Sequence, residues 1–574
     1  MVTAAALVAA VVVFTLFALP PRPIALDTSW RDGAIRGVIH IHTNRSDGLS
    51  SPDEIAAAAA RAGLAFIVFT DHGDATRTPD PPTYRSGVLC LDGVEISTSN
   101  GHYVVLGMDA APYPLGGEAR DVVEDVRRLG GFGIAAHPDS PKTELSWTAW
   151  DTPIDGLELV NPDTSWRVHV LEGGWAAGRR LVPALLTYPV RASETMGHLL
   201  TESPALVRRW EQLTANRRVV STAGADAHAK LELRAGEVGQ NGLSLPVPGY
   251  ESSFRMLSVH VVPTEPLTGD APADATRVLS AIRNGHLYST IDSWAAPAQF
   301  EFTATNATGT ARPGDEMKAS GPLTLQVRSN APAAFHTSIW RDGEAILNDQ
   351  PGPTATVTSD DRPAVYRAEI RSAAQPGAPA WVTSNPIYVR ADRKDPTPAV
   401  AAVPPASPRK DRSLFDGRTA AGWSRESDAQ SLSDIEAVLM TSGMELRLRF
   451  GLLGGADLGQ FAGAAAETSN GVAASDRLAF TIRGERPMRL SIQVRAELKD
   501  APPERWQRSI YLDETDREQT IFFADMAAVG ITHTPRAPLA DVRAIMFIVD
   551  TTNTNPGASG RIWIRNVRLQ GPAD

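Results

Sequence analysis

The chain has 574 residues, 43% of them hydrophobic, which is too long for a single hydrophobic core and predicts three or four domains. Its net charge of −11, from 55 basic and 66 acidic residues, argues against a surface that grips nucleic acid along its length. The single cysteine, Cys90, cannot form an internal disulfide, and its apolar neighbours indicate an ordinary core residue.

Residues 1–26 are predicted to be a signal peptide or a membrane anchor. Residues 4–19 are uncharged and apolar, and Pro20 and Pro21 end this run. Its length, about sixteen residues, lies between the hydrophobic region of a signal peptide and the roughly 20 residues of a spanning helix. No clean Ala-x-Ala site precedes Asp27, which favours an uncleaved anchor. We expect export to a periplasm or the cell exterior, with a buried helix of a cytosolic protein as the alternative.

Residues 27–297 alternate short apolar runs with helical stretches, which is the pattern of an α/β barrel or a layered α/β sheet. Ser51 is a suitable N-cap for the first helix of this region, and Pro52 suits its first position. Strands are expected at 37–42, 64–70, 88–96, 102–107, 133–137, 156–161 and 219–226, and helices at 52–63, 119–129, 205–216 and 275–285.

Histidines and carboxylates stand at the ends of these strands. His40 and His42 are two residues apart in one strand and therefore share a face. The carboxyl ends of parallel strands meet at one mouth of an α/β barrel, so we expect the polar residues to form one site. Imidazole and carboxylate ligands suit Zn, Mn or Fe, and two or three such ions would activate water for hydrolysis. The nine candidate ligands are His40, His42, Asp47, His72, Glu95, His102, His137, Asp226 and His228.

The order of these motifs resembles the PHP family, the polymerase and histidinol phosphatase superfamily, over roughly residues 30–295. The motifs are His40-x-His42 with Asp47, Thr70-Asp71-His72, Glu95 followed by His102, His137-Pro138, and Asp226-Ala227-His228. The resemblance implies a distorted (β/α)7 barrel with three metal ions. It assigns His40, His42, Glu95 and Asp226 to one ion, Asp47, His72 and His137 to a second, and Glu95, His102 and His228 to a third.

The expected mechanism follows from the charges of the ligands. Neutral imidazoles neutralise nothing, so three dications need the carboxylates of Asp47, Glu95 and Asp226. A water held between two ions loses its proton near neutral pH, and the bridging hydroxide is then the expected nucleophile. Arg45 and Lys230 are candidates for stabilising the developing oxyanion, and solvated surface cations are the alternative for both.

Two further polar residues keep two interpretations each. Asp71 is a ligand or only orients a neighbouring group, and Asn161 faces the pocket or caps a turn. The remaining histidines lack carboxylate partners in the sequence and are expected to be solvated or packed: His169, His198, His260, His286, His336 and His533.

The last third of the chain is predicted to be β-rich. Residues 298–391 alternate short apolar runs with turn residues, as in a small Ig-like β-sandwich, and residues 392–413 read as a Pro-rich linker. Residues 414–574 resemble the galactose-binding-type jelly roll of carbohydrate-binding modules, which makes carbohydrate a candidate partner. Trp423 and Trp506 are candidates for stacking on sugar rings, with a core or rim position as the alternative.

Three functions follow from these patterns. The first is a metal-dependent phosphoesterase acting on small phosphorylated molecules. The second is a hydrolase of carboxylic esters, amides or carbamates, because exported PHP-like proteins with appended β-domains resemble carbaryl hydrolases. The third is a surface-binding protein without activity. An Arg-lined pocket would favour the first, and an apolar, aromatic lining the second. Nucleic acid is not an expected partner. The membrane is an expected partner, through residues 1–26.

Overall fold

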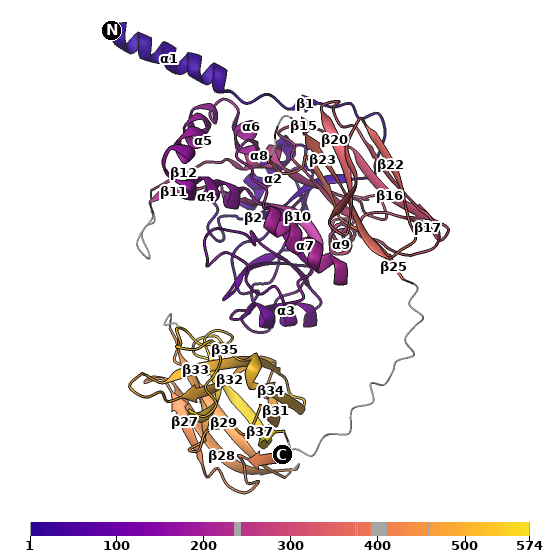
Figure 1. Ribbon diagram of the computed structural model, residues 1–574. Coiled ribbons are helices and arrows are strands. Elements are labelled where there is room, and N and C mark those ends of the chain that lie inside the picture. Colours follow the sequence, from indigo (N-terminus) through magenta and orange to yellow (C-terminus); the bar gives the residue numbers. More distant parts are fainter. Residues whose placement is uncertain are drawn as a thin grey trace. The chain divides into compact units, whose positions relative to one another are not determined.

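The computed structural model describes residues 2–234, 243–373, 375, 377–391, 410–441, 443–455 and 459–572. The chain divides into two compact units, which Figure 1 shows. The first comprises residues 1–110 and 118–394, and the second residues 111–117 and 395–574. The predicted linker lies mostly outside the described residues, because these omit 392–409.

A closed barrel occupies the first unit. Its strand pairing runs from β2 to β3, passes through a bridge between His72 and Glu95 to β6, and continues through β7, β8, β9 and β10 back to β2. The strands of this ring are β2 (Ile35–Ile41), β3 (Phe66–Phe69), β6 (Val94–Thr98), β7 (Gly101–Leu106), β8 (Phe132–Ala135), β9 (Gly156–Val160) and β10 (Val220–Ala227).

The barrel departs from a regular (β/α)7 pattern at β7, which is antiparallel to both β6 and β8. The single strand expected at 88–96 is two strands, β5 (Val88–Asp92) and β6. Gly93 separates them, and a side chain there would lie 2.6 Å from the carbonyl oxygen of Val105. Smaller strands complete this region: β4 (Thr83–Arg85), β11 (Leu231–Arg234), β12 (Leu243–Leu245), β13 (Ser258–Val261) and β14 (Leu287–Thr290).

The helices expected beside the barrel strands are present. They are α2 (Pro52–Arg61), α3 (Ala119–Arg128), α7 (Pro204–Asn216) and α9 (Ala271–Asn284). A further short helix, α8 (Tyr250–Met256), lies between β12 and β13. Ser51 caps α2 in a capping box with Glu54, and Pro52 holds the first helical position, so the predicted helix start is confirmed.

Three helices that the sequence analysis did not anticipate lie between β9 and α7. They are α4 (Pro162–Glu172), α5 (Gly174–Thr187) and α6 (Ala192–Gly197). Asn161 caps α4 by accepting a hydrogen bond from the backbone N–H of Thr164, and Pro162 follows at the first position. Gly173, with φ of 62°, separates α4 from α5. Helix α4 contacts β10 and α5, and α5 contacts α6 (Figure 1).

The N-terminal segment forms α1 (Val2–Ala18), an uncharged helix of 17 residues. It is followed by β1 (Ile24–Ala25), which pairs in parallel with β15 (Ala295–Ala296). Among the residues that the structure describes, no helix combines the length and the apolar character needed to cross a membrane.

The β-sandwich expected at 298–391 is part of the first unit. One sheet has four strands: β17 (Gly309–Ala311), β16 (Phe300–Asn306), β19 (Leu323–Ser329) and β22 (Thr354–Ser359). The facing strands are β18 (Glu316–Lys318), β20 (Phe335–Arg341), β21 (Glu344–Pro351), β23 (Ala364–Ser372), β24 (Val382–Ser384) and β25 (Ile387–Arg390). Because β24 pairs with β14, this second sheet continues directly from strands of the barrel.

The second unit is a β-sandwich of two six-stranded sheets around its own core. One sheet contains β26 (Lys410–Ser413), β28 (Leu432–Met440), β29 (Gly443–Gly451), β31 (Arg477–Gly484), β34 (Arg517–Phe522) and β37 (Ser559–Gly571). The other contains β27 (Trp423–Ser427), β30 (Phe461–Glu467), β32 (Met488–Ala496), β33 (Glu504–Leu512), β35 (Ala527–Ala528) and β36 (Val542–Asp550).

The two tryptophans considered for sugar stacking belong to this core. Trp506 is fully buried and Trp423 is 9% exposed. Their rings pack among apolar side chains of both sheets, so the core interpretation is the correct one. Carbohydrate binding by the second unit stays a prediction, without these two residues as its platform.

Candidate metal centre

The structure brings the nine candidate ligands together at the mouth of the barrel. Four overlapping groups each have their nitrogen and oxygen atoms within 4.8 Å of one another. The groups are His40, Glu95 and His137; His40, His42 and Asp226; His42, Asp47, His72 and His228; and His72, Glu95 and His102.

Glu95, on β6, is the centre of this cluster. Its carboxylate is buried and contacts five imidazoles. Oε1 lies 2.9 Å from His102 Nδ1 and 3.0 Å from His137 Nε2. Oε2 lies 3.2 Å from Nε2 of both His40 and His42 and 3.3 Å from His72 Nδ1. A carboxylate surrounded in this way can bridge two cations, whereas each imidazole fills one position.

A second set of contacts joins the loops that follow β2, β3 and β10. Asp47 Oδ1 lies 3.3 Å from His228 Nε2 and 3.5 Å from His42 Nδ1, and Asp47 Oδ2 lies 3.8 Å from His72 Nε2. Asp226 Oδ1 lies 3.5 Å from both His40 Nε2 and His228 Nδ1. The loop at Asp47 is held against the end of β10, because the backbone N–H of Leu49 donates to the carbonyl of His228 at 3.0 Å.

This grouping differs from the one that the family resemblance implied. His137 lies with His40 and Glu95 rather than with Asp47 and His72. His228 lies with Asp47 rather than with Glu95 and His102. The reason is the strand order: β2 has β3 and β10 as neighbours, whereas β8 stands between β7 and β9. Motif order along the chain does not show which strand ends are adjacent.

The residues fit borderline divalent ions. Within the described part of the chain, Nε2 of His40 and both ring nitrogens of His42 are buried without a hydrogen-bond partner. Buried polar atoms are nearly always hydrogen-bonded, so orphaned imidazole nitrogens beside carboxylates indicate positions for metal ligation. The donor set is imidazole and carboxylate, which suits Zn, Mn and Fe alike.

Glu158, on β9, is a functional residue that the sequence analysis missed. Its Oε1 lies 2.6 Å from His40 Nδ1, and its Oε2 accepts a hydrogen bond from the backbone N–H of His137 at 2.8 Å. It thus orients two of the candidate ligands from behind, as carboxylates commonly do at histidine-bound metals. The available signal was an acidic residue in the middle of the otherwise apolar strand 156–160.

Gly224 and Asn161 keep Glu158 in place. A side chain at Gly224 would put its Cβ only 1.9 Å from Glu158 Oε1, so the carboxylate occupies the space that glycine leaves. The Asn161 amide donates to Glu158 Oε2 at 2.9 Å and to Asp226 Oδ2 at 3.4 Å. Asn161 therefore caps α4 and also faces the site, so both interpretations of this residue apply.

Asp71 orients the loop that carries Asp47. Its carboxylate accepts hydrogen bonds from the backbone N–H and the hydroxyl of Thr43, both at 2.8 Å, and from the hydroxyl of Ser46 at 2.7 Å. Asp71 lies outside the four groups of candidate ligands. Its role is thus to position the backbone of this loop.

Three candidate ligands have strained backbones. His40, His137 and Asp226 have φ of 69°, 29° and 47°, in the left-handed region that non-glycine residues rarely adopt. Such a conformation costs on the order of 1–3 kcal/mol and persists where the surrounding structure enforces it, commonly at functional sites.

The electrostatics keep the carboxylates of the cluster ionised. Burial alone would raise the pKa of Glu95, but His40 and the hydrogen bonds from His102 and His137 hold it well below its ordinary value. The pKa values of Asp47 and Asp226 are lowered in the same way, against burial, by the neighbouring imidazoles. The carboxylates of Glu95, Asp47 and Asp226 therefore stay ionised and can serve as metal ligands.

The histidines respond in opposite directions. Burial lowers the pKa of His137 and His228, but carboxylate contacts outweigh it and raise the pKa of each to about 9. His42 has a lowered pKa, because burial and the nearby His228 disfavour its charged form. His42 is therefore the imidazole most readily available as a neutral ligand.

The two candidate cations have different surroundings. Arg45 forms an ion pair with Asp80, and its Nη1 lies 3.6 Å from Asp92 Oδ1. Its charge is thus balanced by carboxylates, although it borders a hollow of about 100 Å³ beside His72. Lys230 lines a larger cavity together with Asp226 and His228.

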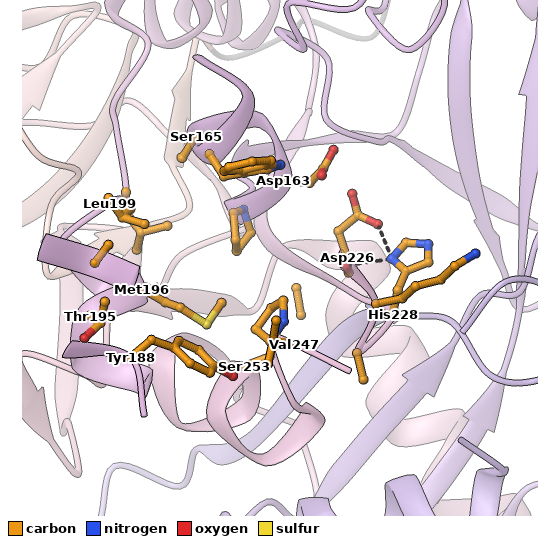
Figure 2. A pocket seen from close by; sticks show the side chains of 18 of the residues that line it. Asp163, Ser165, Tyr188, Thr195, Met196, Leu199, Asp226, His228, Val247 and Ser253 are labelled. Atoms are coloured by element: carbon orange, nitrogen blue, oxygen red, sulfur yellow. Dashed lines mark hydrogen bonds and ion pairs between the residues drawn. The ribbon is translucent and has the colours of Figure 1, made fainter. Parts of the chain in front are cut away.

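This larger cavity, of about 380 Å³, opens beside the cluster (Figure 2). Asp226 and His228 lie at one end, and helices α4, α5 and α6 supply half of the other lining residues. Its apolar lining consists of Pro162, Trp166, Leu181, Ala184, Leu185, Tyr188, Met196, Leu199, Leu200, Ala225, Ala229, Val247 and Pro248.

The other six histidines lie outside the four groups of candidate ligands. His286, His336 and His533 pair with Asp315, Asp349 and Glu504. His169 and His198 contact the carbonyls of Leu199 and Glu194, and His260 stacks on Tyr288. Cys90 is buried, and burial raises the pKa of its thiol to about 11, which makes it unreactive.

Comparisons with known proteins give partial similarities. No protein-family model matches the chain. It is 28% identical over 137 residues to an uncharacterized protein of Methanocaldococcus jannaschii, covering 21% of this chain and 80% of that protein. It is 29% identical over 159 residues to a 3′,5′-nucleoside bisphosphate phosphatase of Chromobacterium violaceum, covering 25% of this chain and 52% of that protein. The chain thus spans about half the length of this phosphatase.

Two solved structures are each similar to part of the chain. A two-domain Bacteroides vulgatus protein, described as containing a predicted PHP-like metal-dependent phosphoesterase, is 15% identical with a TM-score of 0.31. That similarity covers 64% of this chain and 99% of the other. A family 11 carbohydrate-binding module of Clostridium thermocellum is 17% identical with a TM-score of 0.25, covering 29% of this chain and 99% of the module.

Proposed function

We propose that this protein is a metal-dependent phosphoesterase of the PHP type, with two or three divalent ions held by the nine-residue cluster. The observation that carries the proposal is the buried Glu95 carboxylate in contact with five imidazoles. The similarity to a nucleoside bisphosphate phosphatase supports phosphate as the group acted upon. The order of the sequence motifs supports the same choice.

In this proposal the chain's own residues prepare the site. Divalent ions, when bound, supply Lewis acidity and lower the pKa of a coordinated water. Glu158 keeps the His40 proton on Nδ1, so that the Nε2 lone pair points toward Glu95. Asp71 fixes the loop that presents Asp47. Lys230 lines the same cavity as Asp226 and His228, and its positive charge favours an anionic substrate there.

A carboxylic ester, amide or carbamate hydrolase is the second candidate function. The apolar lining of the cavity beside Asp226 and His228 favours it, because such a lining suits a neutral organic group. The same cluster could activate water for attack on a carbonyl carbon. We also retain export as part of the proposal, supported by the uncharged apolar helix α1.

The test is hydrolysis by the full chain loaded with Mn or Zn, using p-nitrophenyl phosphate and p-nitrophenyl acetate. The Asp226→Ala, His228→Ala double variant should abolish turnover of the phosphate. The matched control replaces the surface pair His336 and Asp349, which lie 2.8 Å apart outside the site, by alanines.

Loss of phosphate turnover in the site variant alone supports the phosphoesterase. Turnover of the acetate but not the phosphate selects the second candidate. No turnover of either ester, with metal bound, would favour the surface-binding alternative and contradict the proposed function.

A further inference from the structure

The cavity beside the metal centre has a polar end and an apolar body. Asp163, Asp226 and His228 lie at the polar end (Figure 2), and Lys230 also lines the cavity, whereas most of the other lining side chains are apolar. Its volume of about 380 Å³ falls in the range of small-molecule sites. A substrate that fills this space carries a phosphate at one end and a hydrocarbon group at the other.

The outer surface of the same helices is also apolar. Six large apolar side chains, which we call the α5 patch, are 41–83% exposed: Val170, Leu171, Trp175, Val182, Leu185 and Val190. Outside α1, the other exposed large apolar side chains of the described residues are scattered over the rest of the chain. Large exposed apolar side chains gathered on consecutive helices mark a candidate interaction site.

Leu185 connects the α5 patch with the cavity. It lines the cavity, yet it is 73% exposed, so it stands at the rim between the two. The α5 patch and the apolar wall of the cavity therefore meet at Leu185.

The N-terminal helix lies at the same surface. Helix α1 contacts α5, and the Arg191 guanidinium, beyond the end of α5, donates to the carbonyl of the buried Pro20. Helix α1 has 17 residues and no charged side chain. Two neighbouring apolar surfaces, one of them with an exposed tryptophan, fit a lipid interface.

We propose that α1 and the α5 patch lie on a lipid bilayer, and that the cavity receives the hydrocarbon part of an amphiphilic phosphate ester from it. The inference rests on the proposed function for the reaction, but binding to the bilayer does not. It accounts for an apolar cavity at a centre suited to phosphate, and Arg179, exposed on α5, is placed to meet anionic headgroups.

The first experiment tests bilayer contact without catalysis. The metal-free full chain is mixed with phosphatidylcholine and phosphatidylglycerol vesicles whose acyl chains are brominated, and quenching of tryptophan fluorescence is measured. Trp175→Phe should lose at least about half of the quenching, because Trp175 reaches the acyl region. The control is Trp150→Phe, whose ring lies under Arg209, and it should leave the quenching unchanged.

The second experiment tests the cavity. Calorimetry measures binding of dodecyl phosphate to the full chain and to two variants of α5. Ala184→Phe fills the cavity and should weaken binding at least about tenfold, because the added ring takes the hydrocarbon's place. Ala176→Phe places the same ring on an exposed position of the same helix and should change binding less than about twofold.

The outcomes separate this inference from the proposed function. Equal quenching in Trp175→Phe and the unmodified chain would overturn bilayer docking, and concentration-dependent self-association would assign the patch to a second copy of the chain. Equal affinity of Ala184→Phe and Ala176→Phe for dodecyl phosphate would overturn the cavity assignment. If both experiments fail but p-nitrophenyl phosphate is hydrolysed, the proposed phosphoesterase function still holds. If both experiments succeed but no turnover is found, only the phosphoesterase function is contradicted.

Discussion

The metal centre has two halves that are built differently. The inner half, His40, Glu95 and His137, is at most 4% exposed and comes from barrel strands or their ends. The outer half, Asp47, His72 and His228, is 23–44% exposed and comes from loops. Glu158 and Gly224 fix the inner half from within the core, whereas Asp71 fixes the outer half through a loop.

The difference suggests separate tasks. Side chains locked by packing hold their geometry before any ligand arrives, which favours tight and permanent ligation. Loop residues beside an open cavity can adjust to the ligand and to the exchange of products. We expect inner ligands to control whether the centre forms, and outer ligands to control how it meets the substrate.

The largest effect should come from Glu95→Gln. Glu95→Gln removes the charge of the carboxylate that contacts five imidazoles at the centre of the cluster. Turnover should fall by on the order of 1000-fold, with loss of most bound metal. Elemental analysis and kinetics measure both, and Glu265→Gln, a 70% exposed glutamate, is the control. Full metal content in Glu95→Gln would remove the distinction between the halves.

Gly224→Ala should act on the inner half without touching a ligand. The new Cβ would lie 1.9 Å from Glu158 Oε1, so the carboxylate must leave its position behind His40. Metal affinity should fall by roughly 10- to 100-fold, as for loss of a supporting carboxylate. A chelator competition titration measures it. Gly178→Ala, whose Cβ meets nothing within 4 Å, should keep the affinity of the unmodified chain.

Asp47→Asn should affect the outer half alone. The amide cannot supply the charge that balances a cation among His42, His72 and His228, so about one equivalent of metal should be lost while the rest stays. Turnover should fall about tenfold or more. Asp109→Asn, at an exposed position, is the control. Loss of every ion would mean that the two halves assemble as one unit.

Ser46→Ala should have the smallest effect. It removes one of three hydrogen bonds to Asp71, which destabilises the ordered conformation of the loop by about 1 kcal/mol. The affinity of the outer site for metal should therefore fall roughly fivefold. Titration of the outer site in the unmodified chain and the variant measures this change. An effect on the inner ions would show that Asp71 supports both halves.

The sequence was informative where chemistry and spacing coincide. Nine ligand candidates stand at the ends of recognisable strands, and the structure brings all of them together. The Ser51 and Pro52 signals predicted the start of α2 correctly, because capping depends on local residues.

What the sequence could not provide depends on contacts between distant segments. The pairing of His137 with Glu95, rather than with Asp47, follows from strand order around the barrel. Glu158 received no role from the sequence, because its contacts with His40 and His137 join three different strands and their ends. Helices α4 to α6 were missed, so the cavity that they enclose was not anticipated either.

The left-handed backbones of His40, His137 and Asp226 bear on how such a protein could be engineered. Each residue is held in a conformation that asparagine or glycine would adopt at lower cost. Replacing His137 by asparagine should therefore relieve strain while it destroys the inner half. A library selected for heat resistance alone would discard these residues early, because the fold gains nothing from keeping them. Only simultaneous selection for metal binding or turnover would retain them.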